Sequence, residues 1–368
     1  MSGTSMDAID TALVSIESGT IDLLAYQQFP ISDQVRSAVR KLSAVSPLDE
    51  VMHMDVVLGH LFADAVLKII EQTGHNAQDI RAVGSHGQTV LHHPDSAEPR
   101  TLQIGDANII AYRTGIPTVA DFRRADMAAG GQGAPLAPAL HAHFFRSATG
   151  DRMVLNIGGI ANITLLPAAT DIEVTGFDTG PGNGLLDDWN RRHRGTAMDE
   201  NGAWAASGRV DKPLLNLLLA DPYFSKAPPK STGRDYFNLE WLDGLLGKYT
   251  QAPEPEHVQA TLVMLTARNI ADAIKLHAGS SREIYICGGG THNTHLIQTL
   301  ETCLPEATIA TTDSLGIPPD AVEAVTFAWL GHCRIEGIPG NLPSVTGAER
   351  PVMLGAVYEG SEKCKVES

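Results

Sequence analysis

The sequence predicts an α/β protein made of two similar halves, each of which starts with a glycine-containing hairpin. Glycine-rich turns occupy residues 1–10 and 156–162, about half a chain apart, and each runs into an alternating apolar stretch. Strand-like and helical patterns then alternate, which is typical of an α/β fold. The length of 368 residues exceeds the usual domain size of about 100–200 residues and favours two domains.

The first domain is predicted over residues 1–130. Strand-like stretches at 11–16 and 21–26 flank a Ser-Gly turn, a pattern that predicts a hairpin. Apolar residues recur at helical spacing over 52–69, and a strand-like segment follows at 80–84. Hairpin, helix and strand in this order predict a mixed sheet with helices against it.

The second domain is predicted over residues 131–368 and repeats this order. A strand at 152–156 turns at the second glycine pair and returns along 163–166. The proline-rich stretch 196–256 breaks the pattern, so we interpret it as an insertion, and we expect the C-terminal tail to pack back on the first domain. The remaining elements are expected in alternation, with strands at 174–177, 283–286 and 307–310 and helices at 257–277, 295–303 and 321–335.

Charge and composition exclude several classes of partner. The chain has 27 basic and 43 acidic residues and a formal net charge of -16, whereas nucleic-acid binding requires a basic surface. The cysteines form no CxxC pair and have no histidine at zinc-finger spacing, so we expect reduced thiols, as in the cytosol. Neither a signal-peptide pattern nor an apolar run of roughly 18 residues is present. We therefore expect a soluble, cytoplasmic protein without a membrane partner.

The two glycine-rich turns suit the binding of phosphate groups. Main-chain N–H groups approach an anion closely only where side chains are small or absent, as in both turns. A third turn, at 287–290, ends a strand-like run and suits contact with a base and ribose. A single glycine-rich turn often only reverses the chain, but three turns, each next to a strand, favour a nucleotide site.

Asp178 is the candidate general base. It follows the strand at 174–177 and precedes a helical segment, so its carboxylate is expected at the mouth between the domains, beside a helix N-terminus. The alternative is that Asp178 caps the helix or orders the turn. Catalysis is favoured because capping alone would not require the glycines and Asn183 around it. Asp187, on the same helix, is expected to support Mg²⁺ directly or through water, unless it is a solvated surface carboxylate.

Four polar residues are candidates for binding a sugar. His86 lies in an edge loop with glycine, glutamine and threonine, and such mixed donors and acceptors bind sugar hydroxyls; a structural histidine is the equally weighted alternative. The Arg123 guanidinium can donate two parallel hydrogen bonds to a substrate carboxylate. The alternative is an ion pair with Asp121 at the protein surface. Gln132 lies in a glycine-rich loop, and Glu323, near a helix N-terminus, either bonds the substrate or complements the helix dipole.

Four motifs together resemble the anhydro-N-acetylmuramic acid kinase family. They lie at residues 1–7, 131–135, 156–162 and 177–183, and the resemblance extends over nearly the whole chain. The paired turns alone indicate only the broader sugar kinase, actin and heat-shock chaperone ATPase fold. The resemblance implies two similar domains of this type, each a mixed sheet flanked by helices, with ATP and Mg²⁺ in an interdomain active-site cleft.

The resemblance also implies the reaction and the site residues. The enzyme would hydrolyse the 1,6-anhydro ring of 1,6-anhydro-N-acetylmuramic acid, with Asp178 as base, and phosphorylate the six-position. The products would be N-acetylmuramic acid 6-phosphate and ADP, in the recycling of peptidoglycan. His86, Arg123, Gln132 and Glu323 would bind the sugar, and a homodimer is an assembly left open. The residues implied for ATP are Gly3, Thr4, Ser5, Met6, Asp7, Ala8, Ile9, Asp10, Gly158, Gly159, Gly289 and Gly290.

Two features depart from the family pattern. Ala8 stands where the family has glycine, which requires a negative φ at this residue or a slightly more distant phosphate. The chain also starts inside the first turn, so the apolar strand expected before Ser2 is lacking, and unpaired backbone at a sheet centre costs stability. We therefore expect Met1 to be an internal methionine, a prediction that the intact mass of the native protein tests.

Other functions stay open from the sequence. The same fold would serve another small-molecule sugar kinase, or an ATP hydrolase that uses Asp178 to activate water without a sugar. A non-catalytic, ATP-gated binding protein is the third interpretation. Phosphate release at the full rate without sugar would favour the hydrolase. Substitution of Asp178 with asparagine separates the enzymes from the binding protein, since it should abolish turnover but preserve ATP binding in an enzyme that uses this base.

Overall fold

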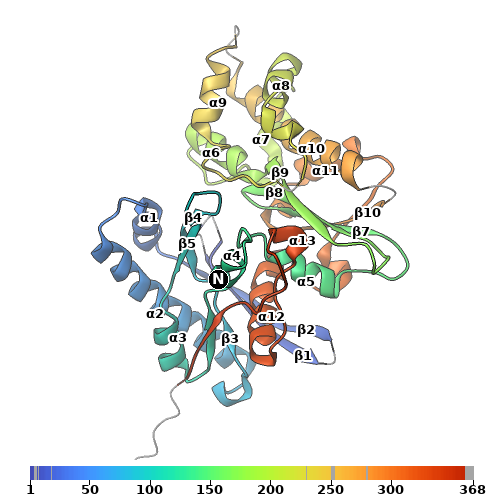
Figure 1. The fold of residues 1–368 in the computed structure, drawn as a ribbon. Helices are drawn as coiled ribbons and strands as arrows, with labels where there is room; N and C mark the ends of the chain where they lie inside the picture. Colours follow the sequence, from blue (N-terminus) through green and yellow to red (C-terminus); the bar gives the residue numbers. More distant parts are fainter. Residues whose placement is uncertain are drawn as a thin grey trace, which may run out of the picture. The chain divides into compact units, whose positions relative to one another are not determined.

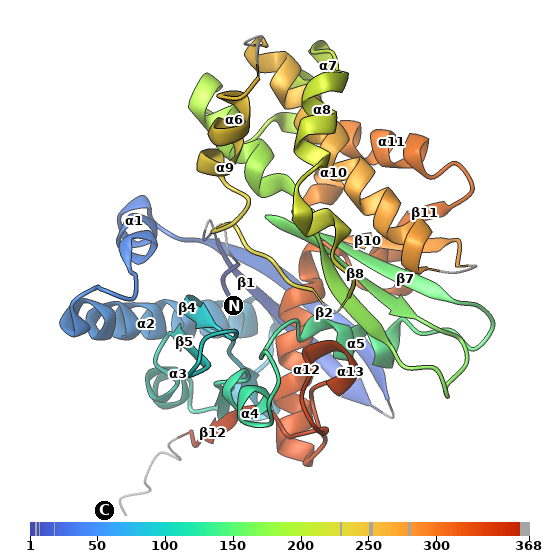
Figure 2. The same cartoon turned by 45° about the horizontal axis from the view of Figure 1, so that its top comes forward.

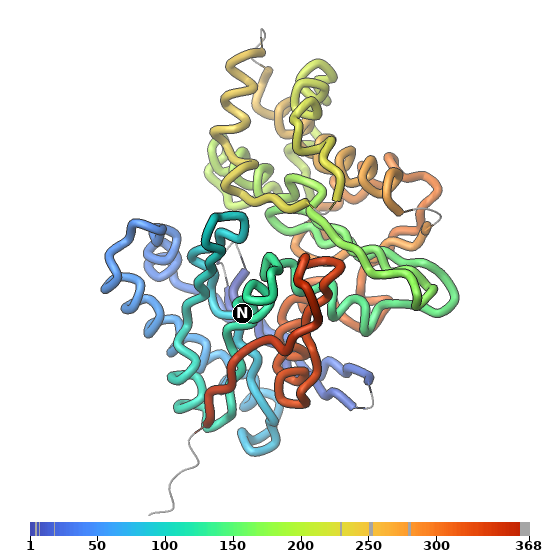
Figure 3. The backbone as a smooth tube through the Cα atoms, in the orientation of Figure 1, coloured from blue at the N-terminus to red at the C-terminus, as the bar shows by residue number. Residues whose placement is uncertain are grey.

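The chain forms two compact units in the computed structural model, which describes residues 1–3, 6, 8–17, 19–228, 230–249, 253–278 and 281–360. Unit 1 comprises Met1–Phe144 with Ala321–Ser368, and unit 2 comprises Phe145–Asp320 (Figure 1). The chain passes from unit 1 to unit 2 after Phe144, which is later than the predicted boundary at residue 130. The helix predicted at 321–335 belongs to unit 1. Figure 3 shows this return, because the red C-terminal trace lies beside the blue and cyan segments of unit 1.

Unit 1 combines short sheets with helices that cover them. Its strands are β1 (Ala8–Glu17), β2 (Thr20–Pro30), β3 (Val83–Gly84), β4 (Gln88–His93), β5 (Arg100–Ile104), β6 (Thr118–Ala120) and β12 (Ala356–Tyr358). Its helices are α1 (Asp33–Lys41), α2 (Leu48–Thr73), α3 (Ala107–Thr114), α4 (Arg124–Ala128), α5 (Ala137–Phe144), α12 (Val322–Glu336) and α13 (Pro343–Thr346). Among the described helices of both units, none combines the length and hydropathy needed to cross a bilayer.

The predicted first hairpin is present and is longer than the sequence pattern indicated. β1 pairs with β2 in antiparallel register, from Ala8 opposite Pro30 to Glu17 opposite Thr20, and the register shifts after Leu13. Ala8 is the first residue of β1 and is extended, a conformation that alanine adopts without strain. The alanine at this position is therefore accommodated by the backbone.

A separate three-stranded sheet has the order β12-β6-β3, with β3 parallel and β12 antiparallel to β6. Helix α12 packs on β3 at Gly84, where an added Cβ would lie 1.9 Å from the carbonyl oxygen of Phe327. Only glycine permits this approach. Helix α2 buries Leu58 and Phe62 in one apolar cluster with Ile9 of β1, and Ile69 in a second cluster with Leu13 of the same strand. Helices from both ends of the chain therefore contribute to unit 1.

Unit 2 is built on a five-stranded mixed sheet of order β11-β10-β7-β8-β9. β7, β8 and β9 form an antiparallel meander, whereas β10 runs parallel to both β7 and β11. Figure 2 shows α7, α8, α10 and α11 over one face of this sheet. The predicted α/β class, with mixed sheets and flanking helices, is confirmed. The strands are β7 (Arg152–Ile157), β8 (Ile160–Leu166), β9 (Thr175–Pro181), β10 (Glu283–Cys287) and β11 (Thr308–Thr311), and the helices are α6 (Asn183–Arg194), α7 (Ala203–Ser207), α8 (Lys212–Leu219), α9 (Leu239–Leu246), α10 (Pro255–His277) and α11 (Thr294–Cys303).

The stretch predicted as an insertion, 196–256, contributes to the core of unit 2. Leu214, Leu218 and Leu242 are fully buried in the same apolar cluster as the central strands. The rings of Tyr223 and Phe237 contact each other, with 5.4 Å between their centroids. The segment 230–234 lies between these two residues in the sequence and bonds to β9 through the Lys230 carbonyl, which accepts from the Asp178 N–H.

Candidate active site

Asp178 lies within β9, opposite Asn162 of β8, rather than after the strand as the sequence suggested. The 230–232 segment encloses it: the Asp178 N–H donates to the Lys230 carbonyl at 3.1 Å, and Oδ2 accepts from the Thr232 N–H at 2.9 Å. The Tyr223 hydroxyl donates to the Asp178 carbonyl at 2.8 Å. Position and orientation of the carboxylate are therefore fixed by strand pairing and by one loop.

The surroundings of Asp178 favour a carboxylate that exchanges a proton near neutral pH. Burial raises its pKa to about 6, and this effect outweighs the Thr232 N–H and the Lys230 charge, which both lower the pKa. Part of the side chain stays accessible. The alternative role in capping does not hold, because the N-cap of α6 is Gly182 and no side chain bonds there.

The glycine turn between β7 and β8 holds the start of α6. The Asn183 N–H donates to the Gly158 carbonyl at 2.8 Å, and the N–H groups of Gly182 and Gly184 each donate to the Gly159 carbonyl at 3.1 Å. A Cβ on Gly182 would lie 2.4 Å from the Gly158 oxygen, so this junction requires glycine. These three N–H groups at the start of α6 donate to the carbonyls of the turn. The predicted attraction of an anion to this helix N-terminus therefore cannot come from hydrogen bonds to these three groups.

The third glycine turn lies against the second. A Cβ on Gly288 would meet Asn156 Oδ1 at 2.3 Å, and one on Gly290 would meet the Ile157 side chain at 2.3 Å. By contrast, a Cβ on Gly289 would have no atom within 4 Å. The structure thus brings Gly158, Gly159, Gly289 and Gly290 together at the carboxyl ends of the parallel neighbours β7 and β10, as expected for ligand contacts in such sheets.

Arg234 lies beside the Gly158-Gly159 turn, where a Cβ on Gly159 would meet its Cδ at 3.1 Å. Its Nη2 donates to both carboxylate oxygens of Asp188, at 2.9 and 2.8 Å. The neighbouring Asp187 is half-buried on α6. No group of three or more His, Cys, Asp or Glu side chains that could hold a metal ion converges among the described residues.

In unit 1, the structure brings together three of the four predicted sugar residues. Nε2 of His86 accepts from Arg123 Nε at 3.1 Å and Nη2 at 2.9 Å, and its Nδ1 lies 3.0 Å from the Gly87 carbonyl. The proton is therefore on Nδ1. Burial and the Arg123 charge hold the pKa of His86 well below its usual value, and the ring packs against Phe327 in a tilted arrangement with 4.4 Å between the ring centroids. A neutral, oriented imidazole results.

Arg123 and Glu323 form the charged part of this cluster. Arg123 Nη1 donates to the Gly133 carbonyl at 2.7 Å, and burial lowers the pKa of Arg123 to about 10, although Glu323 opposes this shift. The alternative pairing of Arg123 with Asp121 is wrong, because Asp121 pairs with Arg124 at 3.5 Å. Glu323 stays accessible, while desolvation and the Asp10 carboxylate raise its pKa.

The first glycine turn lies next to Glu323. A Cβ on Gly3 would be 3.9 Å from Glu323 Oε2, and the Ser2 hydroxyl donates to Gln88 Oε1 at 2.6 Å. Asp10 Oδ1 accepts from Tyr26 at 2.6 Å, which ties it to β2. Ile9 is buried in the core. The backbone at Met6 is in the left-handed region, with a φ of 53°. The predicted ATP residues Thr4, Ser5 and Asp7 lie outside the described residues.

Gln132 is held on a loop whose anchor is Asp126. The Asp126 carboxylate is fully buried and accepts three hydrogen bonds of 2.7 Å, from the Gly133 N–H, Asn341 Nδ2 and the Thr346 hydroxyl. Gln132 itself donates from Nε2 to Asp95 at 3.2 Å. This hydrogen bond joins Gln132 to the β4–β5 connection, whereas Arg123 bonds the next residue of the same loop, Gly133.

Sequence reasoning missed the residues that support these groups. Lys230, Thr232 and Arg234 lie in the run Lys-Ser-Thr-Gly-Arg-Asp at 230–235, within the stretch predicted as an insertion. A basic, hydroxyl- and glycine-containing run of this kind is a usable signal for a ligand loop. Asp126 gave no comparable signal, because its partners at 341 and 346 are distant in sequence.

Comparison with known proteins gives a consistent result over nearly the whole chain. A family model described as anhydro-N-acetylmuramic acid kinase matches residues 1–360. The protein of that name from Coxiella burnetii (strain RSA 493 / Nine Mile phase I) is 48% identical over 364 residues, which cover 98% of this chain and 97% of the relative. The Vibrio cholerae protein of that name is 46% identical over 361 residues, covering 97% and 96%.

Similar solved structures are more distant. The activator of the 2-hydroxyisocaproyl-CoA dehydratase from Clostridium difficile, with bound ADPNP, has a TM-score of 0.42 at 13% identity, covering 89% of this chain and 96% of its own. A ROK family glucokinase from Streptomyces griseus, in complex with glucose and AMPPNP, has a TM-score of 0.37 at 14% identity, covering 88% and 99%.

Proposed function

The chain belongs to the anhydro-N-acetylmuramic acid kinase family, and we propose that Asp178 is the base with which it opens the anhydro sugar. The protein is an ATP-dependent carbohydrate kinase of peptidoglycan recycling. It hydrolyses the 1,6-anhydro ring of 1,6-anhydro-N-acetylmuramic acid and phosphorylates the six-position, giving N-acetylmuramic acid 6-phosphate and ADP. The observation that supports the assignment of the base is the enclosed Asp178 carboxylate, whose pKa burial raises to about 6.

Asp178 takes a proton from a water molecule as that water attacks the anomeric carbon. The bond from this carbon to the bridging six-position oxygen breaks, and the freed oxygen attacks the γ-phosphorus of ATP, so that ADP leaves. A base with a pKa near the operating pH is largely ionised and still basic enough to accept the proton. The Thr232 N–H, at 2.9 Å from Oδ2, holds one oxygen and leaves Oδ1 for the water.

We propose that the glycine turns bind the nucleotide and that Asp187 supports Mg²⁺. The main chain at Gly3, at Gly158-Gly159 and at Gly289-Gly290 lets phosphates or the nucleoside approach closely. A half-buried single carboxylate such as Asp187 fits Mg²⁺, which keeps several waters and usually takes one or two carboxylates beside phosphate oxygens. When bound, Mg²⁺ neutralises charge on the phosphate oxygens.

The unit 1 cluster is proposed to bind the sugar. Glu323 is an accessible acceptor for sugar donors, and the neutral His86 is oriented by Arg123 and the Gly87 carbonyl. Because Arg123 already donates to His86 and to the Gly133 carbonyl, we propose that Arg123 mainly orients this cluster. Gln132 supplies a further amide. We also propose that the protein is a cytoplasmic homodimer and that it binds neither nucleic acid nor a membrane.

Isotope labelling tests the reaction. The protein is incubated with ATP, Mg²⁺ and 1,6-anhydro-N-acetylmuramic acid in water enriched in heavy oxygen, and the product is analysed by mass spectrometry. We expect one label at the anomeric hydroxyl and none in the phosphate ester, because the bridging oxygen stays with the six-position carbon. Release of labelled inorganic phosphate at the full rate without sugar would instead identify an ATP hydrolase.

Lys230→Met should shift the acid limb of the kcat profile to higher pH. The positive charge of Lys230 lowers the pKa of Asp178, so its removal raises the pKa from about 6 and delays ionisation. We expect a shift of up to about one pH unit, in line with nearby opposite charges. Lys226→Met is the matched control, because Lys226 is exposed and contacts Tyr223. An unchanged limb in Lys230→Met would show that another group controls it.

A further inference from the structure

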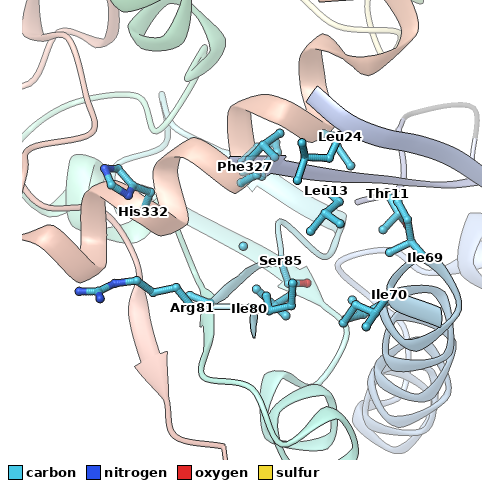
Figure 4. A pocket seen from close by; sticks show the side chains of 18 of the residues that line it. Thr11, Leu13, Leu24, Ile69, Ile70, Ile80, Arg81, Ser85, Phe327 and His332 are labelled. Atoms are coloured by element: carbon cyan, nitrogen blue, oxygen red, sulfur yellow. The ribbon is translucent and has the colours of Figure 1, made fainter. Parts of the chain in front are cut away.

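The apolar cavity of unit 1 does not suit an anion. This cavity, of about 530 Å³, is lined by apolar side chains that include Leu13, Ile70 and Phe327 (Figure 4). Arg81 lines it as well, but its guanidinium pairs with Glu336 at 2.8 Å. Apolar walls stabilise an anion poorly, because they do not replace its hydration. The cavity therefore offers little to a nucleotide phosphate, whereas unit 2 contains an arginine beside a glycine turn.

The Arg234 side chain lies over the junction between the Gly158-Gly159 turn and helix α6. A Cβ on Gly159 would meet Arg234 Cδ at 3.1 Å, and one on Gly184 would meet Arg234 Nε at 3.2 Å. The guanidinium thus lies at the start of α6, where the main-chain N–H groups of residues 182–184 already donate to the turn. A cationic side chain therefore occupies the place where free helix N–H groups would otherwise attract an anion.

Asp188 holds one nitrogen of this guanidinium and leaves the others available. Arg234 Nη2 donates to both oxygens of Asp188, at 2.9 and 2.8 Å, and Asp188 Oδ1 also accepts from Arg191 at 3.0 Å. Within the described part of the chain, Arg234 Nε and Nη1 have no hydrogen-bond partner. The side chain is 32% exposed, so a ligand can reach it. Because two arginines share one carboxylate, the three groups together carry a net positive charge.

The chain on both sides of Arg234 is anchored. Before it, the Thr232 N–H donates to Asp178 Oδ2 at 2.9 Å. After it, the Phe237 N–H donates to the Gly233 carbonyl at 3.1 Å, and the Phe237 ring is buried. A guanidinium that is fixed in this way loses little freedom when a ligand binds, which favours affinity.

This anchoring also places Arg234 near the reacting groups. The two-residue step from Thr232 to Arg234 spans at most about 7 Å. In the proposed reaction, the water activated by Asp178 attacks the anomeric carbon, and the six-position oxygen of the same ring attacks the γ-phosphorus. The phosphoryl group that is transferred is therefore the phosphate of ATP nearest to Asp178 and to the loop that carries Arg234.

We propose that Arg234 binds the terminal phosphoryl group of ATP, an inference that rests on the nucleotide site proposed at the glycine turns. The N–H donors on Nε and Nη1 bond oxygens of this group. Asp188 is a positioning residue, because it holds Nη2 and thereby orients the guanidinium. During transfer, the guanidinium neutralises charge on the phosphoryl oxygens, as cationic groups do in phosphoryl-transfer enzymes.

The test compares Arg234→Gln with the matched control Arg192→Gln, both in the full chain. Arg192 belongs to the same unit and also pairs with an aspartate, since it donates to Asp243 at 2.6 and 3.0 Å. Calorimetry measures the Kd for ADP and for the β,γ-imido analogue of ATP, both with Mg²⁺. In Arg234→Gln we expect the Kd for the analogue to rise at least about tenfold and that for ADP to stay within about threefold of the parent value. The control should bind both as the parent does.

Turnover and its pH dependence separate phosphate binding from a purely structural role. Arg234→Gln should lower kcat by roughly 10–100-fold, because the transferred group loses a cationic contact in the transition state. Arg234→Lys keeps the positive charge and should have a kcat between those of Arg234→Gln and the parent. The acid limb of the kcat profile should stay in place in both variants, because Thr232 still donates to Asp178.

An arginine that only anchors the loop predicts a different result. Arg234→Gln would then weaken both nucleotides equally and shift the acid limb to higher pH, because Asp178 loses the Thr232 N–H that lowers its pKa. That result overturns the proposal, and so does a Kd for the analogue that equals the parent value or rises equally in Arg192→Gln. If Arg234→Gln loses its folded circular dichroism signal, the two Kd values of Arg234→Lys decide by the same criteria. A parent protein that binds neither nucleotide would instead contradict the nucleotide site itself.

Discussion

Asp178→Asn is expected to lower kcat by about 10²–10⁴-fold, the contribution typical of a general base. Asparagine has almost the same shape and can still accept the Thr232 N–H that now bonds Oδ2 at 2.9 Å. The fold and the 230–232 loop should therefore be retained, whereas the group that accepts the proton of the attacking water is lost. The rate is measured by ADP release that depends on the anhydro sugar, and nucleotide binding by calorimetry.

Asp171→Asn is the matched control, because Asp171 is an exposed aspartate of the same unit. It should leave kcat within twofold of the parent, and both variants should bind ATP as the parent does. A kcat for Asp178→Asn above about one tenth of the parent value would rule out the proposed base. The acid limb near pH 6 should also disappear in Asp178→Asn, since the group that titrates is gone.

The same substitution removes one contribution to the pH dependence of stability. Burial raises the pKa of Asp178 from 3.8 to about 6, so the folded state binds more protons than the unfolded state between these values. The free energy of unfolding of the parent should therefore fall as pH rises from about 4 to about 6, relative to that of Asp178→Asn. Urea unfolding at several pH values measures this difference.

Asp126→Asn is expected to lower the free energy of unfolding by about 2–4 kcal/mol, because hydrogen bonds to a buried charged group contribute about 1.5–3 kcal/mol each. The carboxylate accepts from three donors, whereas an amide has one oxygen and places N–H groups against a donor. Asn341 cannot turn its oxygen toward this amide without losing the Val352 N–H, which that oxygen accepts at 2.7 Å. Urea unfolding provides the measurement.

Asp95→Asn serves as the comparison, because Asp95 accepts an exposed bond from Gln132 on the same loop. It should change the unfolding free energy by less than about 0.5 kcal/mol, as is usual at surfaces. Equal stability of Asp126→Asn and the parent would show that the buried network tolerates a neutral amide and does not anchor the loop.

Local patterns predicted most elements because hydrophobic spacing and glycine turns are short-range signals. The helix predicted at 257–277 is α10 at Pro255–His277, and the strand predicted at 283–286 is β10 at Glu283–Cys287. The strand predicted at 80–84 is shorter in the structure, at Val83–Gly84. Periodicity cannot reveal which distant segment a strand contacts. The membership of α12 in unit 1 depends on its approach to Gly84, which no local pattern encodes.

The candidate site was predictable where chemistry and turn geometry coincide in a short motif. Asp178 and the glycine turns have this property, and so has the His86 loop. The neutral state of His86 was not predictable, because it arises from burial and from Arg123, which lies in another segment. Similarly, Thr232 and Asp178 are 54 positions apart in the sequence, so their contact is not encoded by a local pattern.

The discontinuous composition of unit 1 has a consequence for synthesis on the ribosome. All of unit 2, Phe145–Asp320, has been translated before α12 and β12 emerge, so it can fold while its neighbour still lacks those two elements. Until then, the face of β3 that α12 will cover stays exposed. Nascent chains arrested shortly after residue 320 should therefore contain one protease-resistant body and one segment open to chaperones and digestion.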